Sequence, residues 1–197
     1  MASVFSQTSS EDSVKTCFMN YRSAILNDKG DDAVQYLDSR TVAYYDYILA
    51  QTITADSSKL ATFSTMDKLM VLMIRHRIDT TTIFSLDGKE LIVLAIQMGM
   101  IGKNSVINNS VAEVKIDQNF ARGQLAVNGK PQSVYFHFYR EEKQWKIDLT
   151  SIFPLGETAF NNVIAESKLS NDDFIFDLLT RLTGIKPDGK IWLPLKN

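Results

Sequence analysis

The chain has little cysteine, because Cys17 is the only one among its 197 residues. A single cysteine excludes an internal disulfide and any metal cluster built from several cysteines. Cys17 lies among the apolar positions of a predicted helix, and free cysteine in such places is usually buried. We therefore interpret it as a buried, inert thiol and not as a nucleophile.

The chain also lacks an excess of positive charge and any long apolar run. Its formal net charge is -2, with 45% hydrophobic and 22% charged residues, and it contains neither a basic run nor a basic stripe. This composition argues against nucleic acid and an anionic membrane surface as partners, and we expect neither. The longest apolar run, residues 91–101, is interrupted by Gln97 and is too short to span a bilayer.

Several recognisable signals are missing as well. The first ten residues lack the basic and apolar regions of a secretory signal, so we expect a cytoplasmic protein, although a signal removed earlier would leave the same pattern. No pair of histidines has ligand spacing and no carboxylate cluster has the spacing of a calcium loop, so we expect no metal and no cofactor. We find no repeat and no linker composition. One domain over residues 1–197 is the simplest organisation.

The strongest pattern that is present is a run of three β-hairpins between residues 111 and 153. Asn128-Gly129 is typical of a two-residue type I′ turn, in which both residues take φ > 0. It pairs Val127 with Lys130, and turns near 118–119 and 142–143 continue the ladder. All three registers put one apolar set on one face, which predicts a four-stranded antiparallel meander with one buried side. That set is Val114, Ile116, Ala121, Gly123, Leu125, Val134, Phe136, Phe138, Ile147 and Leu149.

The opposite face of this predicted sheet is mixed in character. It carries Glu113, Lys115, Phe120, Arg122, Gln124, Tyr135, His137, Tyr139, Lys146 and Asp148. Aromatic side chains gathered on a charged face indicate that something covers part of it: a helix of this chain, a second subunit or a ligand. An ordinary outer face also tolerates isolated tyrosines. We name Phe120, Arg122, Tyr135 and Tyr139 as the candidate residues that bind a ligand or partner.

Helical spacing dominates the rest of the chain. After a flexible N-terminus at residues 1–12, we expect helices throughout residues 13–102, with Gly30 ending the first, Gly102 ending the last, and residues 80–86 as the only strand-like stretch. Beyond the sheet at 111–153, we expect helices within 156–184 and an extended tail at 186–197. Capping boxes at Ser64, Asp87 and Ser170 mark three of the helix starts.

Helices followed by a long four-stranded meander resemble the cystatin-like group, and within it the nuclear transport factor 2-like superfamily. The resemblance rests on the order of elements and on residues 112–149, above all the strand that ends in Trp145-Lys146-Ile147-Asp148-Leu149. It implies an α+β fold in which a curved sheet wraps helices, here with extra C-terminal helices. It also implies either a lyase or isomerase of small hydrophobic molecules or a non-catalytic binding domain. No motif of the superfamily transfers a catalytic residue to this chain.

His137 and Asp148 form the best candidate for catalysis, because the register puts them directly opposite each other. A carboxylate that holds a histidine in one tautomer is the orienting unit of general acid and base catalysis, and Tyr135 or Tyr139 could polarise a carbonyl. We therefore name His137 and Asp148 as the candidate catalytic residues. A surface cross-strand ion pair gives the same pattern and is the simpler interpretation. The pair also lies on the face away from the apolar core.

Two classes of function fit these features. In the first, the protein is a non-catalytic domain that binds a small hydrophobic ligand or a protein partner, including a second copy in a homodimer, through the Tyr135 face. In the second, it is a cofactor-free lyase or isomerase that uses His137 and Asp148. We rank binding first, because the sequence offers aromatic surface but no nucleophile or oxyanion motif.

Overall fold

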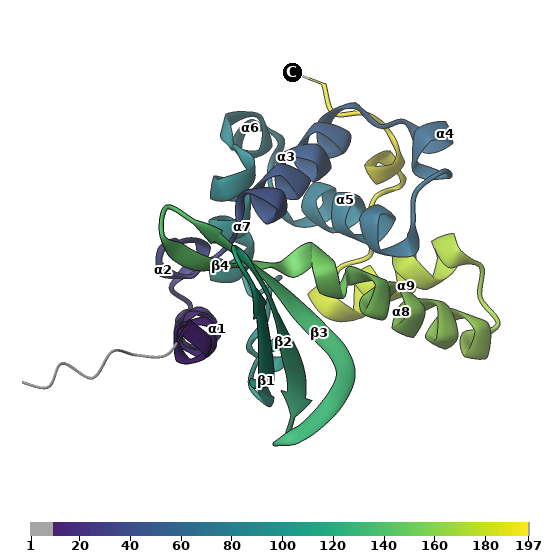
Figure 1. Ribbon diagram of the computed structural model, residues 1–197. Coiled ribbons are helices and arrows are strands. Elements are labelled where there is room, and N and C mark those ends of the chain that lie inside the picture. Colours follow the sequence, from purple (N-terminus) through teal and green to yellow (C-terminus); the bar gives the residue numbers. More distant parts are fainter. Residues whose placement is uncertain (1–9, 197) are drawn as a thin grey trace, which may run out of the picture. The chain divides into compact units, whose positions relative to one another are not determined.

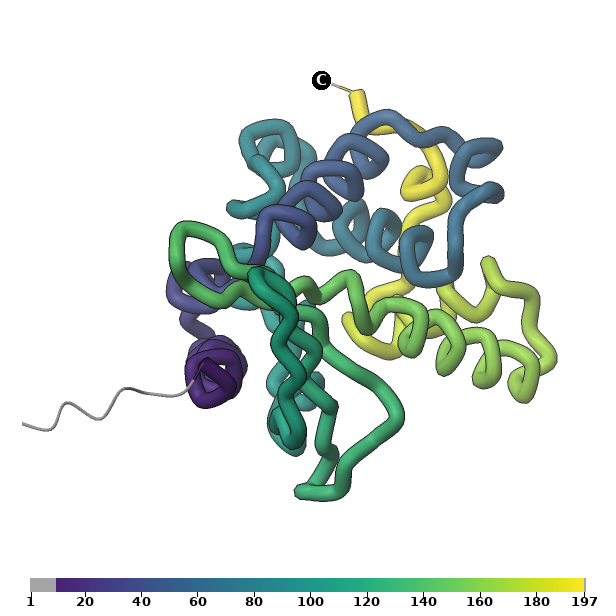
Figure 2. Tube along the Cα trace, in the orientation of Figure 1, coloured from purple at the N-terminus to yellow at the C-terminus, as the bar shows by residue number. Residues whose placement is uncertain are grey.

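A computed structural model describes residues 10–196 (Figures 1 and 2). These residues divide into two compact units. Unit 1 contains residues 10–42 and Ile92–Ile152, and unit 2 contains Ala43–Leu91 together with the chain from Phe153 onward. Each unit thus uses two separate stretches of sequence. The expectation of one domain over residues 1–197 stays a prediction.

Unit 1 is built around the predicted sheet. Its strands are β1 (Asn109–Asp117), β2 (Phe120–Val127), β3 (Lys130–Glu141) and β4 (Gln144–Asp148). They are antiparallel and lie in the order β1-β2-β3-β4, as Figure 1 shows. The α+β class and the four-stranded meander are therefore confirmed. The strands begin and end slightly earlier than the predicted range of 111–153.

The predicted register is correct at the hairpin turns. Val127 pairs with Lys130, Ile116 with Ala121, and Phe138 with Ile147. Asn128 and Gly129 have φ values of 51° and 74°, as a type I′ turn requires.

The predicted uniform ladder is wrong in three places. One irregularity lies between Val111 and Val114 of β1, and another lies between Gln124 and Ala126 of β2. The first is a bulge that lets Val111 and Val114, which are an odd number of residues apart, both face the core. The third error concerns Leu149, which begins the 3₁₀ helix η2 (Leu149–Ile152) and does not pair with Phe136.

Helix α1 (Ser10–Leu26) packs on the apolar face of the sheet, against β1, β2 and β4. The rings of Phe18 and Phe136 meet at 4.9 Å between centroids. Gly123 lies under this layer, because a Cβ added to it would be 2.7 Å from Val111 Cγ1 and 2.8 Å from Phe138 Cε2. The missing side chain therefore makes room for two core residues.

Cys17 is buried in the same layer, as predicted. Its Sγ donates a hydrogen bond to the carbonyl oxygen of Trp145 at 3.0 Å. Burial raises the pKa of the thiol to about 12, although the nearby charge of Lys146 acts in the opposite direction. The thiol is therefore protonated at neutral pH.

The helical part of the chain agrees with the prediction in outline and differs in detail. The further helices are α2 (Gly30–Val34), α3 (Ser39–Thr54), α4 (Ser57–Leu60), α5 (Thr65–Arg77), α6 (Thr80–Ser85), α7 (Gly88–Gln97), α8 (Phe153–Ser167) and α9 (Asn171–Thr183), with 3₁₀ turns η1 (Lys103–Ser105) and η3 (Gly189–Trp192). Ser64 and Ser170 cap α5 and α9, and Asp87 and Glu90 exchange the hydrogen bonds of a capping box.

Four expectations about the helices need correction. Residues 10–12 belong to α1, and the rest of the predicted flexible N-terminus lies outside the described residues. The stretch at 80–86 forms α6, because the side chain of Asp79 caps a helix there. Gly30 begins α2 and does not end α1. Helix α7 ends at Gln97, since Gly99 takes a left-handed φ of 67° that stops it before Gly102.

In unit 2, the buried side chain of Arg75 fixes the C-terminal segment. Its guanidinium donates to the carbonyl oxygens of Thr52 at 2.7 Å, Ala55 at 2.7 Å and Ile191 at 2.9 Å. Burial lowers the pKa of Arg75 to about 10, so the group stays charged at neutral pH. Its partners are carbonyls at the end of α3 and in η3, and the arrangement is therefore structural.

We expect Gly123→Ala to lower the free energy of unfolding by about 1–3 kcal/mol, the usual cost of overpacking a filled core. Urea unfolding measures it. Gly102→Ala is the matched control, because its added Cβ would lie 3.6 Å from its nearest neighbour, the Gly99 oxygen. Equal losses in the two variants would contradict the packing argument.

Arg75→Met should loosen the C-terminal segment, since each buried carbonyl left without a donor costs about 1–3 kcal/mol. Hydrogen exchange at the Leu195 amide, which donates to the Ile53 oxygen at 2.9 Å, reports the loss directly. The control is Arg181→Met, which removes an exposed guanidinium from the same unit. Unchanged protection of Leu195 in Arg75→Met would show that the segment is held by other contacts.

Cys17 should resist thiol reagents in the folded protein. A pKa of about 12 leaves a thiolate fraction roughly a thousandfold below that of an ordinary exposed cysteine. Labelling with a chromogenic disulfide at pH 8 should therefore proceed only as fast as the protein unfolds. Rapid labelling of the native protein would mean that the thiol is accessible.

Candidate functional site

The outer face of the sheet brings the predicted binding residues together. Phe120 is the cross-strand partner of Tyr139, Arg122 that of His137, and Gln124 that of Tyr135. Strand alternation then puts all these side chains on one side of β2 and β3. We call Phe120, Arg122, Tyr135, His137 and Tyr139 the aromatic face.

Three rings of the aromatic face are in contact through Phe120. Phe120 lies 5.2 Å from the His137 ring in an edge-to-face arrangement and 5.2 Å from the Tyr139 ring. The guanidinium of Arg122 lies 5.8 Å from the centre of the Tyr135 ring. Arg122 is exposed and the four rings are half-buried. Three of the rings are thus in contact around Phe120, and Tyr135 with Arg122 forms the open end of the face.

The first turn of α3 covers the other end of the face. The guanidinium of Arg40 stacks 3.5 Å from the centre of the Tyr139 ring and donates to the Asp38 carboxylate at 3.1 Å. This hydrogen bond raises the pKa of Arg40, and the charges of Asp38 and Asp148 act in the same direction. A helix of this chain, one of the three covers that the sequence left open, therefore accounts for the Tyr139 end.

This turn is attached to β4 by hydrogen bonds that the sequence did not predict. The fully buried Asp38 accepts from the backbone and the hydroxyl of Thr41, both at 2.9 Å, and its own N–H donates to the Ile147 oxygen at 3.0 Å. The Thr41 hydroxyl in turn accepts from the Leu149 N–H at 2.9 Å. A signal for this arrangement was available in the sequence. Asp38 is a favourable N-cap residue, and its carboxylate accepts from the N–H of Thr41, three residues later.

His137 and Asp148 are cross-strand partners, as the register predicted. The Asp148 carboxylate, however, accepts from the backbone N–H of Thr150 at 2.9 Å and from the Thr150 hydroxyl. The structure gives the His137 ring no hydrogen bond to any residue in 10–196; its aromatic contact is Phe120. Without a carboxylate that fixes its tautomer, the imidazole lacks the orienting partner of a general base.

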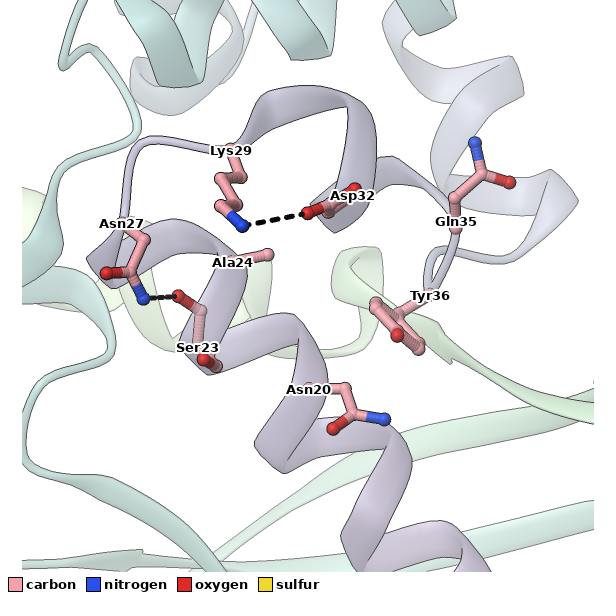
Figure 3. A pocket seen from close by; sticks show the side chains of 8 residues that line it. All are labelled: Asn20, Ser23, Ala24, Asn27, Lys29, Asp32, Gln35 and Tyr36. Carbon is pink, nitrogen blue, oxygen red and sulfur yellow. Dashed lines mark hydrogen bonds and ion pairs between the residues drawn. The ribbon is translucent and has the colours of Figure 1, made fainter.

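A separate hollow lies between α1 and α2 (Figure 3). Its volume is about 240 Å³, and its lining is polar. Lys29 and Asp32 pair with each other across it at 3.7 Å, and Asn27 donates to the Ser23 oxygen. Among the described residues that line the hollow, the only two charged side chains therefore pair with each other.

Within residues 10–196, no group of three or more histidine, cysteine, aspartate or glutamate side chains could hold a metal ion. None of the helices in the same range has both the length and the apolar character that crossing a bilayer requires.

Comparison with known proteins gives no further assignment of this site. Neither a family model, nor a curated protein, nor a solved structure matches the chain.

Proposed function

We propose that this protein is a non-catalytic binding domain whose contact surface for another protein is the open end of the aromatic face. One observation carries the proposal: the half-buried rings of Phe120, Tyr135 and His137 share one face of β2 and β3 with the exposed guanidinium of Arg122, which lies over the Tyr135 ring. Tyrosine and arginine are the residues in which the binding energy of protein interfaces concentrates.

The shape of the site favours a protein over a small hydrophobic ligand. Ligands of that kind bind in concave, mostly apolar pockets that enclose most of their surface. The aromatic face is one side of a sheet, and the hollow at α1 and α2 is polar. A flat strip of rings with a cation at its edge suits a partner that presents apolar and acidic side chains together.

The alternative function, a cofactor-free lyase or isomerase, has less support. It depends on His137 and Asp148 acting as a unit, and the Asp148 carboxylate is already engaged by Thr150. The opposed positions of the two residues remain its one favourable observation.

Membership of the nuclear transport factor 2-like superfamily is also part of the proposal. It is supported by the four-stranded antiparallel sheet with α1 packed on its apolar face. Binding domains without catalysis are among the members that this resemblance implies.

The binding proposal is tested with a photo-activated cross-linking residue placed at Arg122 in cells of the source organism. We expect one discrete cross-linked product whose yield falls at least about tenfold when Tyr135 is changed to Ala, since removing one interface anchor commonly costs 2 kcal/mol or more. Quantitative mass spectrometry of the cross-linked band measures the yield.

The matched control carries the cross-linker at Asn104, an exposed residue of η1 in the same unit. A product that forms equally from Asn104, or that survives Tyr135→Ala, would contradict a specific contact at the aromatic face. A product composed of two copies of this chain would identify the partner as a second copy.

A further inference from the structure

A groove runs along α1 on the side of the β3–β4 hairpin, separate from the aromatic face. Its volume is about 660 Å³, within the usual range for a site that holds a small molecule. Helix α1 contributes the hydroxyl groups of Ser10, Ser13 and Thr16 to its lining. The groove shares Asn20, Gln35 and Tyr36 with the hollow of Figure 3, whose one carboxylate among the described residues, Asp32, pairs with Lys29.

The charged residues in the lining of the groove are all positive. Arg140, Lys143 and Lys146 come from the β3–β4 hairpin, and no carboxylate of residues 10–196 lines the groove. The structure pairs neither Arg140 nor Lys143 with an acidic side chain of residues 10–196. Lys146 donates to the backbone oxygen of Gln35, which is a neutral partner.

The acidic side chains near these cations lie outside the described lining of the groove. Glu141 lies between two of the cations in sequence but accepts from the hydroxyl of Ser39 at 2.7 Å. Glu11, Asp12 and Glu142 are exposed and lie outside the lining. In a chain of net charge -2, three cations gathered without a carboxylate favour an anion in the groove.

The floor of the groove adds a backbone donor. The outer edge of β4 is closed at Ile147, whose N–H donates to the Tyr36 oxygen at 2.7 Å. Two residues earlier, the oxygen of Trp145 on the same edge accepts from Cys17 at 3.0 Å. In an antiparallel strand, the N–H and the C=O of one residue point to the same edge. The Trp145 N–H therefore faces this outer edge too. The positive charge of Lys146 lies close enough to Cys17 to oppose the rise in its pKa that burial causes.

We propose that this groove binds a small organic phosphate, with Arg140, Lys143 and Lys146 on the phosphate oxygens and the α1 hydroxyls on the rest of the molecule. Arginine and lysine with backbone N–H groups are the usual partners of phosphate. The volume exceeds what an inorganic ion fills and leaves room for an organic portion beside Tyr36.

The test is calorimetric titration of the full chain at low salt with tripolyphosphate and with adenosine triphosphate, followed by amide chemical shifts. We expect saturable binding of both probes, with adenosine triphosphate at least about tenfold tighter because its organic portion also contacts the groove. The largest shifts should fall on Thr16 and Trp145. The double variant Arg140→Gln/Lys143→Gln should weaken both probes at least about tenfold.

The matched control is Lys115→Gln/Lys130→Gln, which removes the same charge from positions on β1 and β3 outside the groove lining. It should leave both affinities within about twofold. The proposal is overturned by an absence of saturation up to about 1 mM, by equal affinity for the two probes, or by equal losses in both double variants. All four substituted residues are exposed, and thermal melting verifies that the variants fold.

Discussion

The pairing of β3 with β2 on one side and β4 on the other is the constraint on which unit 1 depends. Side chains alternate along each strand, so this pairing alone decides that Phe136 and Phe138 face α1 while Tyr135, His137 and Tyr139 face outward. A slip of one residue would exchange the two sets. The bulge in β1 preserves the separation where the odd spacing of Val111 and Val114 would break it.

The aromatic face and the groove along α1 have different chemistry because they use different parts of the same hairpin. The aromatic face displays rings held by ring contacts, with charge only at its rim. The groove displays cations from the end of β3, from the turn and from β4, beside the hydroxyls of α1. Glu141 helps to separate the two surfaces. It accepts a hydrogen bond from Ser39 beside the aromatic face and does not form an ion pair with Arg140 or Lys143.

Buried polar side chains hold the irregular parts of both units. In unit 1, Asp38 and Thr41 attach the first turn of α3 to the end of β4. In unit 2, Arg75 holds the carbonyls of α3 and η3. The sequence predicted neither role. Arg75 is one of three adjacent basic residues in the last turn of α5, and nothing in that local pattern distinguishes the one that packing buries. Such groups are retained because an unsatisfied carbonyl or carboxylate in the interior is costly.

The sequence by itself determined the sheet, its turns and its two faces, because those follow from local rules: φ > 0 at Asn128-Gly129 and alternation along the strands. It also located the starts of α5 and α9, because each capping serine bonds to a residue only three positions later in the chain. Only the tertiary structure decided that Asp148 bonds to Thr150 and leaves His137 unsupported, that Arg40 covers Tyr139, and that α1 and the hairpin enclose a cationic groove. The last two depend on contacts between residues far apart in the chain, and the first depends on the turn of the backbone from β4 into η2. Periodicity encodes neither.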